Sequence, residues 1–82
     1  MRYTVELKPK AEKDLKAMPK DDSHDMYDAL LALESGLTGD IKKLTDHWPE
    51  YRLRMRNWRA LFEIEGDKII VYRIRHRREA YR

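Results

Sequence analysis

The sequence predicts an α+β fold in which two N-terminal helices pack on one face of an antiparallel meander sheet, in the order β-α-α-β-β-β. Two observations support this prediction. Between residues 9 and 37, apolar side chains recur every three or four positions, which is the period of an amphipathic helix. From Tyr51 onward, apolar and polar residues alternate, which is the period of a half-buried strand. The chain has 82 residues and no linker-like segment, so one domain is expected over residues 1–82.

The N-terminal part is predicted to form one strand and two helices. Residues 2–7 alternate between apolar and polar side chains, which predicts the strand. Proline suits the first turn of a helix, so the first helix should begin at Pro9 and end before Pro19. The second helix should start with the polar residues 21–23, whose acidic groups favour a helix N-terminus, and Gly36 should cap its end. The side chains expected to face the sheet are Tyr3, Val5, Leu7, Ala11, Leu15, Met18, Met26, Leu30, Leu33 and Leu37.

The segment between the helices and the meander, residues 37–50, has no sustained period. It contains Gly39 and Pro49, which interrupt regular structure. We therefore interpret it as a connecting loop that is anchored to the body of the protein by Leu44 and Trp48.

Three strands follow, joined by two short turns. Gly66–Asp67 is a typical two-residue hairpin turn, and Arg56–Asn57 has the same length. Turns of two residues fix the register, so we expect Arg54 opposite Arg59, with Arg52 on the same face. The side chains expected on the other face, toward the helices, are Leu53, Met55, Trp58, Ala60, Phe62, Ile64, Ile69 and Val71.

Positive charge is concentrated in the meander. Residues 1–50 carry eight Lys or Arg against eleven Asp or Glu, whereas residues 51–82 carry ten against four. Nine of those ten cations are arginines, whose planar guanidinium can pair two oxygens of a phosphate. Arginines gathered on one face of a sheet therefore favour nucleic-acid binding. The alternative is a solvated face whose guanidiniums pair with Glu63 and Glu79.

The composition argues against other kinds of site. The chain has no cysteine, and its three histidines are scattered without the spacing of a zinc site, so no metal and no cofactor is expected. The longest apolar run, Ile69–Tyr72, is too short to span a membrane. We expect no membrane partner and a cytoplasmic location.

Four short motifs follow one another in the second half of the chain. They are KKL at 42–44, YRLR at 51–54, WRALFEI at 58–64 and RIRHRREAYR at 73–82. In this order and spacing, after one strand and two helices, they resemble the RelE/ParE superfamily of bacterial type II toxins, and above all its RelE branch. The layout is similar over the whole chain, and the motifs are specific from Lys42 onward.

The resemblance implies a RelE-like fold and a toxin of a type II toxin-antitoxin system. Such a toxin is an endoribonuclease that cuts messenger RNA on the ribosome, without a metal, through attack of the ribose 2′-hydroxyl on the scissile phosphate. The implied partners are a cognate antitoxin, the ribosome and mRNA. Operator DNA would be contacted only through the antitoxin.

The resemblance also implies roles for single residues. Arg59 and Arg77 match arginines that act on the scissile phosphate, Tyr81 matches an active-site tyrosine, and His76 lies where some relatives carry a catalytic histidine. Arginine stays protonated and is a very poor base, so proton transfer or substrate orientation would fall to His76 and Tyr81. The further candidates for RNA binding are Arg52, Arg54, Arg56 and Arg78.

The sequence departs from the family pattern at two positions. Arg56 stands where a small residue or glycine is usual, and Arg75 replaces a common glycine; both could alter the grip on RNA. Two other functions stay open: a ParE-like inhibitor of DNA gyrase, and a module that binds nucleic acid or an antitoxin without catalysis. The tail residues His76, Arg77 and Tyr81 favour the nuclease.

Overall fold

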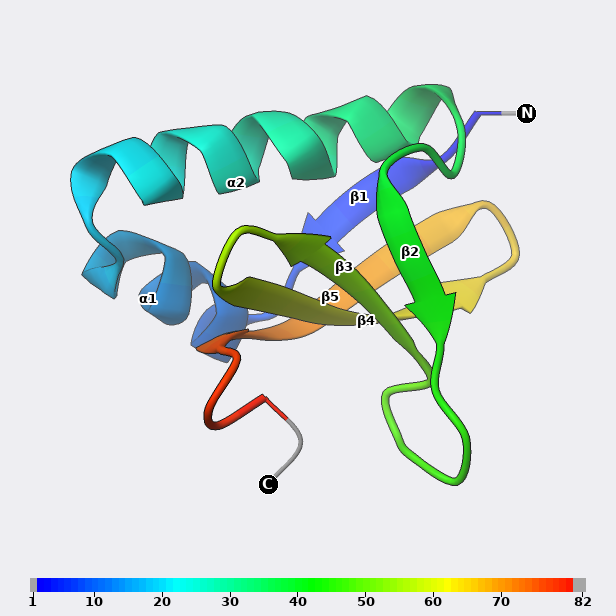
Figure 1. Ribbon diagram of the computed structural model, residues 1–82. Coiled ribbons are helices and arrows are strands. Elements are labelled where there is room, and N and C mark those ends of the chain that lie inside the picture. Colours follow the sequence, from blue (N-terminus) through cyan, green and yellow to red (C-terminus); the bar gives the residue numbers. More distant parts are fainter. Residues whose placement is uncertain (1, 81–82) are drawn as a thin grey trace.

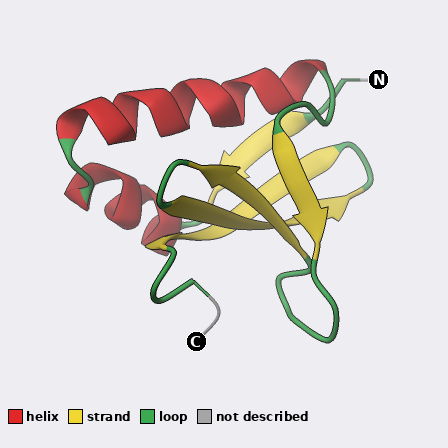
Figure 2. Ribbon diagram, in the orientation of Figure 1, coloured by secondary structure: helices red, strands yellow, loops and turns green. Residues whose placement is uncertain are grey.

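The strands of the protein form one mixed sheet, and the helices cover one of its faces (Figures 1 and 2). The computed structural model describes residues 2–80. The elements are β1 (Thr4–Leu7), α1 (Pro9–Ala17), α2 (Lys20–Ala32), the 3-10 turn η1 (Leu33–Ser35), β2 (Asp40–Lys43), β3 (Tyr51–Met55), β4 (Trp58–Glu65) and β5 (Lys68–His76). Within these residues, no helix combines the length and the apolar composition that a membrane crossing requires.

The sheet has the strand order β1-β5-β4-β3-β2. The predicted meander of β3, β4 and β5 is confirmed, with both turns in the expected places and Arg54 directly opposite Arg59. The sheet is mixed rather than wholly antiparallel, because β1 pairs with β5 in parallel. The two helices between β1 and the rest of the sheet supply the long connection that a parallel pair requires.

Part of the predicted loop is a strand. Residues 40–43 form β2 and pair antiparallel with β3, which makes β2 an edge strand. Three of its four side chains are exposed and only Ile41 is half-buried, so the sequence carries no alternation long enough to indicate a strand. Glycine at position 39 allows the chain to approach β3 closely, because its φ is 99° and a Cβ there would lie 3.2 Å from Cδ1 of Leu53.

The helical stripes and the inner face of the sheet form the core. The predicted stripes are confirmed except for Leu37, which is 44% exposed. Gly36 does not cap α2 as predicted: α2 ends at Ala32, and Gly36 caps the 3-10 turn η1 that follows it. The core consists of Ala11, Met18, Met26, Leu30, Leu33, Leu53, Ala60, Phe62, Ile69, Val71 and Ile74. The core therefore fixes which face of each strand remains available for a ligand.

The β2–β3 loop is anchored differently from our prediction. Trp48 is 64% exposed and is not buried against the body of the protein, whereas Pro49 is buried and Leu44 is half-buried. The smaller ring of Pro49 takes the buried position, and the larger ring of Trp48 remains on the surface. This loop and the segment after β5 both project on the side of the sheet away from α2 (Figure 1).

A β-bulge in β5 changes which face of the sheet each of the following side chains points to. Phe62 on β4 is opposite Val71, but the preceding Leu61 is opposite Arg73, so Tyr72 is an extra residue. Simple alternation from Val71 would point Arg73 toward the helices. With the bulge, Ile74 enters the core instead, and Arg73 lies on the outer face beside Leu61.

A carboxylate on α1 holds this part of β5. The Asp14 side chain accepts hydrogen bonds from Nε of Arg73 at 2.7 Å and from the Ile74 N–H at 2.9 Å. Because β1 ends opposite Val71, the Ile74 N–H lies beyond the parallel pairing. Asp14 therefore connects α1 to the strand at the point where pairing with β1 stops.

Replacement of Asp14 by alanine is expected to lower the free energy of unfolding by about 1–2 kcal/mol, because a guanidinium and a strand N–H lose their acceptor at a half-exposed site. Urea unfolding followed by circular dichroism measures this change. Asp28→Ala removes an exposed carboxylate from α2 and is expected to change stability by less than about 0.5 kcal/mol. Equal midpoints for the two variants would contradict the role of Asp14.

Candidate nucleic-acid interface

The outer face of the sheet carries arginines in two rows that cross β3, β4 and β5. We call the five residues Arg52, Arg54, Arg59, Arg73 and Arg75 the arginine face. One row is formed by Arg54, Arg59 and Arg75, and in the other Arg52 and Arg73 flank Leu61. Like charges directly across a ladder are destabilising, so this arrangement requires compensation by anions.

Asp40 on the edge strand β2 compensates the β3 end of both rows. Its carboxylate accepts from Nη1 of Arg52 at 3.1 Å and from Nε of Arg54 at 2.5 Å. The hydrogen bond from Arg52, with the further hydrogen bond and charge of Arg54, lowers the pKa of Asp40 below its ordinary value. The two ion pairs are therefore formed at neutral pH.

The β5 end of each row is also compensated. The hydrogen bond to Asp14 raises the pKa of Arg73, and Arg75 lies 3.6 Å from the carboxylate of Glu79. The suggested pairing of the face with Glu79 is thus observed, whereas Glu63 accepts from the N–H of Glu50. Both rows are held by carboxylates at their ends.

Arg59 is different because it lies at the centre of a row. Within residues 2–80 it has no carboxylate partner, and its Nη1 donates to the carbonyl oxygens of Arg56 and Trp58 at 3.0 and 3.1 Å. Neutral acceptors leave the charge of the guanidinium uncompensated. An anion that binds this face therefore finds its strongest unpaired cation at Arg59.

The segment after β5 returns toward the turn between β3 and β4. The Arg77 N–H donates to the carbonyl of Asn57 at 2.7 Å, which places Arg77 beside the end of the strand that carries Arg59. The side chains of Arg77 and Arg78 are exposed, and neither has an acidic partner in the described part of the chain. Ala80 is buried, so the segment folds back onto the protein.

Two predicted site residues lie on the helix side of the sheet. His76 is opposite Trp58, and their rings meet edge to face with centroids 5.4 Å apart. Arg56 pairs with Asp22 and Asp25 on α2, and these two hydrogen bonds raise its pKa. The structure therefore brings together Arg52, Arg54 and Arg59 but separates them from His76 and Arg56.

The backbone conformation at Arg56 explains why a small residue suits this position. Its φ of 56° lies in the left-handed region, which glycine and asparagine adopt most easily. Asp22, which pairs with Arg56, also accepts from the indole N–H of Trp58 at 3.0 Å. The departure from the family pattern is accommodated by contacts with α2. Tyr81, the remaining predicted site residue, lies outside the described residues.

Sequence reasoning missed two features of this face. Asp40 belongs to a strand too short to show a period, and only the pairing of β2 with β3 places it beside the arginines. The rings of Trp48 and Tyr72 lie 4.6 Å apart between centroids, although 24 residues separate them in the sequence.

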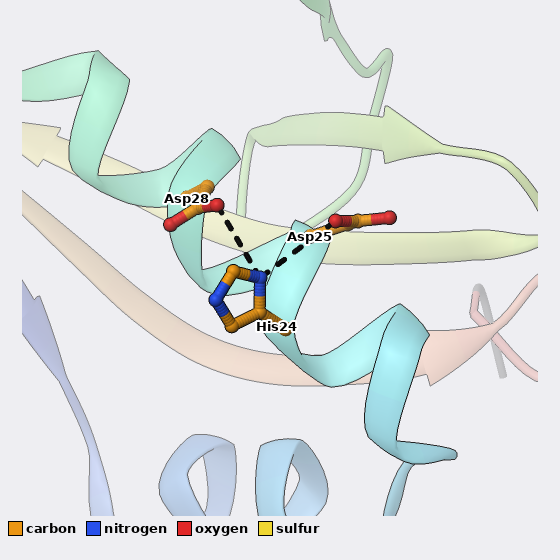
Figure 3. Close-up of side chains that lie close together, drawn as sticks. All are labelled: His24, Asp25 and Asp28. Carbon is orange, nitrogen blue, oxygen red and sulfur yellow. Dashed lines mark ion pairs between the residues drawn. The ribbon is translucent and has the colours of Figure 1, made fainter.

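A second group of titratable side chains lies on α2, away from the arginine face. His24 Nδ1 is 3.5 Å from the carboxylate of Asp28 and 3.9 Å from that of Asp25 (Figure 3). Within the described residues, these three side chains are close enough together to hold an ion. His24 and Asp28 are exposed, all three project from a single helix, and the half-buried Asp25 is shared with Arg56, so we assign no metal to them.

Comparison with protein families gives one match over most of the chain. The family described as the ParE toxin of the type II toxin-antitoxin system parDE matches residues 5–81. Toxin RelE3 of Methanocaldococcus jannaschii is 43% identical over 42 residues, which are 51% of this chain and 48% of that protein. The aligned part thus spans about half the length of this relative.

Solved structures give similarity over nearly the whole fold. A RelB-RelE antitoxin-toxin complex from Methanococcus jannaschii contains a chain with a TM-score of 0.75 and 29% identity, covering 88% of this chain and 89% of that one. The RelBE2 complex of Mycobacterium tuberculosis contains a chain with a TM-score of 0.79 and 20% identity, covering 93% of this chain and 99% of that one. The RelE-RelB complex of Pyrococcus horikoshii contains a chain with a TM-score of 0.77 and 22% identity, covering 98% of this chain and 100% of that one. The last two show similarity of fold.

Replacement of Asp40 by asparagine is expected to increase the affinity of the arginine face for a single-stranded oligonucleotide, because Arg52 and Arg54 lose a competing anion. The logarithm of the binding constant should fall more steeply with the logarithm of salt concentration, by about 0.7 for each additional phosphate that the protein neutralises. Fluorescence anisotropy at several salt concentrations measures both changes.

Asp21→Asn is the matched control, since it also removes one negative charge from the protein, but from α2 and not from the arginine face. Equal gains for the two variants would show that net charge alone is responsible. Protonation of Asp40 below its depressed pKa also breaks both ion pairs, so the difference in affinity between the wild type and Asp40→Asn should disappear at that pH.

Proposed function

Because this chain belongs to the ParE toxin family of type II toxin-antitoxin systems, within the RelE/ParE superfamily, we propose that it is a toxin that cleaves messenger RNA on the ribosome. The observation that carries the proposal is the uncompensated Arg59 at the centre of an arginine row, with Arg77 beside the same turn. Similarity to a RelE-named toxin supports the nuclease branch of the superfamily.

The proposed reaction needs no metal. The ribose 2′-oxygen attacks the adjacent phosphorus, the bond from phosphorus to the 5′-oxygen breaks, and the products are a 2′,3′-cyclic phosphate and a 5′-hydroxyl. A base accepts the 2′-hydroxyl proton, and an acid donates one to the departing 5′-oxygen. Negative charge increases on the phosphate oxygens in the transition state, and Arg59 and Arg77 are proposed to stabilise it.

Proton transfer is assigned to Tyr81 and His76, and flanking phosphates to Arg52 and Arg54. His76 contacts Trp58 on the helix side, so its participation requires the end of β5 to turn toward the arginine face. Docking on the ribosome is proposed to induce this turn, which would also make cleavage dependent on the ribosome. Arg78 is proposed to add a phosphate contact at the margin of the site, and Arg56 could add another only by leaving Asp22 and Asp25.

The proposed protein partner is a cognate antitoxin. All three similar structures described above are toxin-antitoxin complexes. An acidic antitoxin segment would suit the arginine face, because its carboxylates could replace the phosphates of RNA. Contact with operator DNA would then come through the antitoxin.

A second candidate function is inhibition of DNA gyrase, which the ParE description of the matching family favours. It predicts DNA damage that depends on gyrase, with messenger RNA left intact. The arginine face would then serve to bind a protein or DNA, and loss of Arg77 or Tyr81 would have no effect on RNA.

Replacement of Arg59 by alanine is expected to reduce mRNA cleavage on programmed ribosomes by about 10²- to 10³-fold, as for loss of one donor to a transition-state oxyanion. Primer extension maps the new RNA ends. Lys16→Ala on α1 removes an exposed cation from another surface and should leave the cleavage rate unchanged. Intact message with the wild-type protein, together with gyrase-dependent DNA breaks, would overturn the nuclease proposal.

Replacement of His76 by glutamine tests its assignment separately. Glutamine can form hydrogen bonds but cannot transfer a proton, so the variant should cleave about 10²- to 10⁴-fold more slowly, the range for loss of one general acid or base, while its oligonucleotide affinity is retained. A residue that only packs against Trp58 would instead lower the unfolding temperature and leave the cleavage rate of the folded variant nearly unchanged. That second result would remove His76 from the proposed chemistry.

A further inference from the structure

An aromatic pair lies at one side of the arginine face. Trp48 comes from the β2–β3 loop and Tyr72 is the extra residue of the bulge in β5. Their ring centroids are 4.6 Å apart, and the ring planes are inclined at 57°. This separation leaves no room for a third ring between them. Because Trp48 is 64% exposed, its outward face is the surface on which another planar group could stack.

The pair borders a hollow of about 340 Å³, at the lower end of the range for small-molecule sites of about 300–1,000 Å³. Leu61 and Ala80 form its apolar floor, with exposed fractions of 3% and 2%. Lys10 and Arg75 are among the cations that line it, and none of its described lining residues is aspartate or glutamate. Its chemistry is therefore aromatic and cationic, although Arg75 and its neighbour Arg73 are also paired with Glu79 and Asp14 outside the hollow.

The hollow is continuous with the row that contains Arg59. Leu61 lies two residues from Arg59 on β4, which corresponds to about 7 Å along a strand. Arg75 belongs both to that row and to the lining of the hollow. A phosphate held between Arg59 and Arg75 would thus have its neighbouring nucleotide within reach of the aromatic pair.

The loop that presents Trp48 is held at both ends. The Leu44 N–H donates to the carbonyl of Glu50 at 2.6 Å, and the Glu50 N–H donates to the carboxylate of Glu63 on β4. Between them, His47 Nδ1 lies 2.9 Å from the carbonyl oxygen of Pro49. An exposed aromatic ring on a closed loop loses little freedom when it binds, which favours a recognition role.

We propose that Trp48, supported by Tyr72, is a stacking site for one base of single-stranded RNA, next to the phosphate held by Arg59 and Arg75. This assignment rests on the proposed function and adds a base contact to the phosphate contacts of the arginine face. Aromatic faces beside cations are the usual means of binding unpaired bases, and stacking tolerates every base because each has a π-face. The lack of acidic groups among the described residues of the lining favours RNA over a basic protein segment.

The test compares two oligomers of equal length and charge: hexauridylate and a ribose-phosphate hexamer that carries no bases. Wild-type protein should bind hexauridylate more tightly than the baseless hexamer. Trp48→Ala should weaken the binding of hexauridylate by about 5- to 150-fold, the range for loss of one stacked base. Affinity for the baseless hexamer should not change. Trp48→Phe should retain most of the preference for hexauridylate while losing the quenching of tryptophan fluorescence that stacking on Trp48 produces.

Tyr27→Ala is the matched control, since it removes an exposed aromatic ring from α2, and circular dichroism checks that each variant is folded. Equal affinity of the wild type for the two oligomers would overturn the stacking site, and cleavage on ribosomes would show independently whether the nuclease proposal stands. Unchanged RNA binding by Trp48→Ala with weaker antitoxin binding would also overturn it and assign the aromatic pair to a protein interface.

Discussion

The bulge at Tyr72 is the constraint on which the arrangement of this protein depends. Up to Val71, β5 points alternate side chains into the core in register with β1. One extra residue shifts that alternation, so Ile74 enters the core while Arg73 and Arg75 join the outer face. This single insertion completes the core with Ile74 and adds two arginines of β5 to those that β3 and β4 already place on the other face.

Such a concentration of charge is tolerated because the protein supplies its own anions at the margins. Asp40 on an edge strand and Asp14 on a helix each hold arginines at the end of a row. The central Arg59 is left with backbone carbonyls alone among the described residues. An external anion would therefore meet no carboxylate competitor at Arg59, whereas at the margins it would have to displace one.

The aromatic pair gives this face a second kind of chemistry. Phosphate contacts alone hold any nucleic acid, whereas a ring on a closed loop beside them can distinguish an unpaired strand from a duplex, whose bases are already stacked. Trp48 reaches this position because Pro49 takes the buried place in the loop. If Trp48 were buried in place of Pro49, this loop would present no aromatic ring beside the arginine face.

The helices, the three-stranded meander and the register of Arg54 with Arg59 could be predicted from the sequence, because periodicity and two-residue turns are local properties. It also indicated the family, through the order of short motifs, and the match over residues 5–81 confirmed it. Long-range pairing makes residues 40–43 an edge strand, brings Asp40 into ion pairs with two arginines and sets His76 against Trp58. Each of these depends on pairing between distant segments or on one bulged residue, and no local pattern in the chain records either.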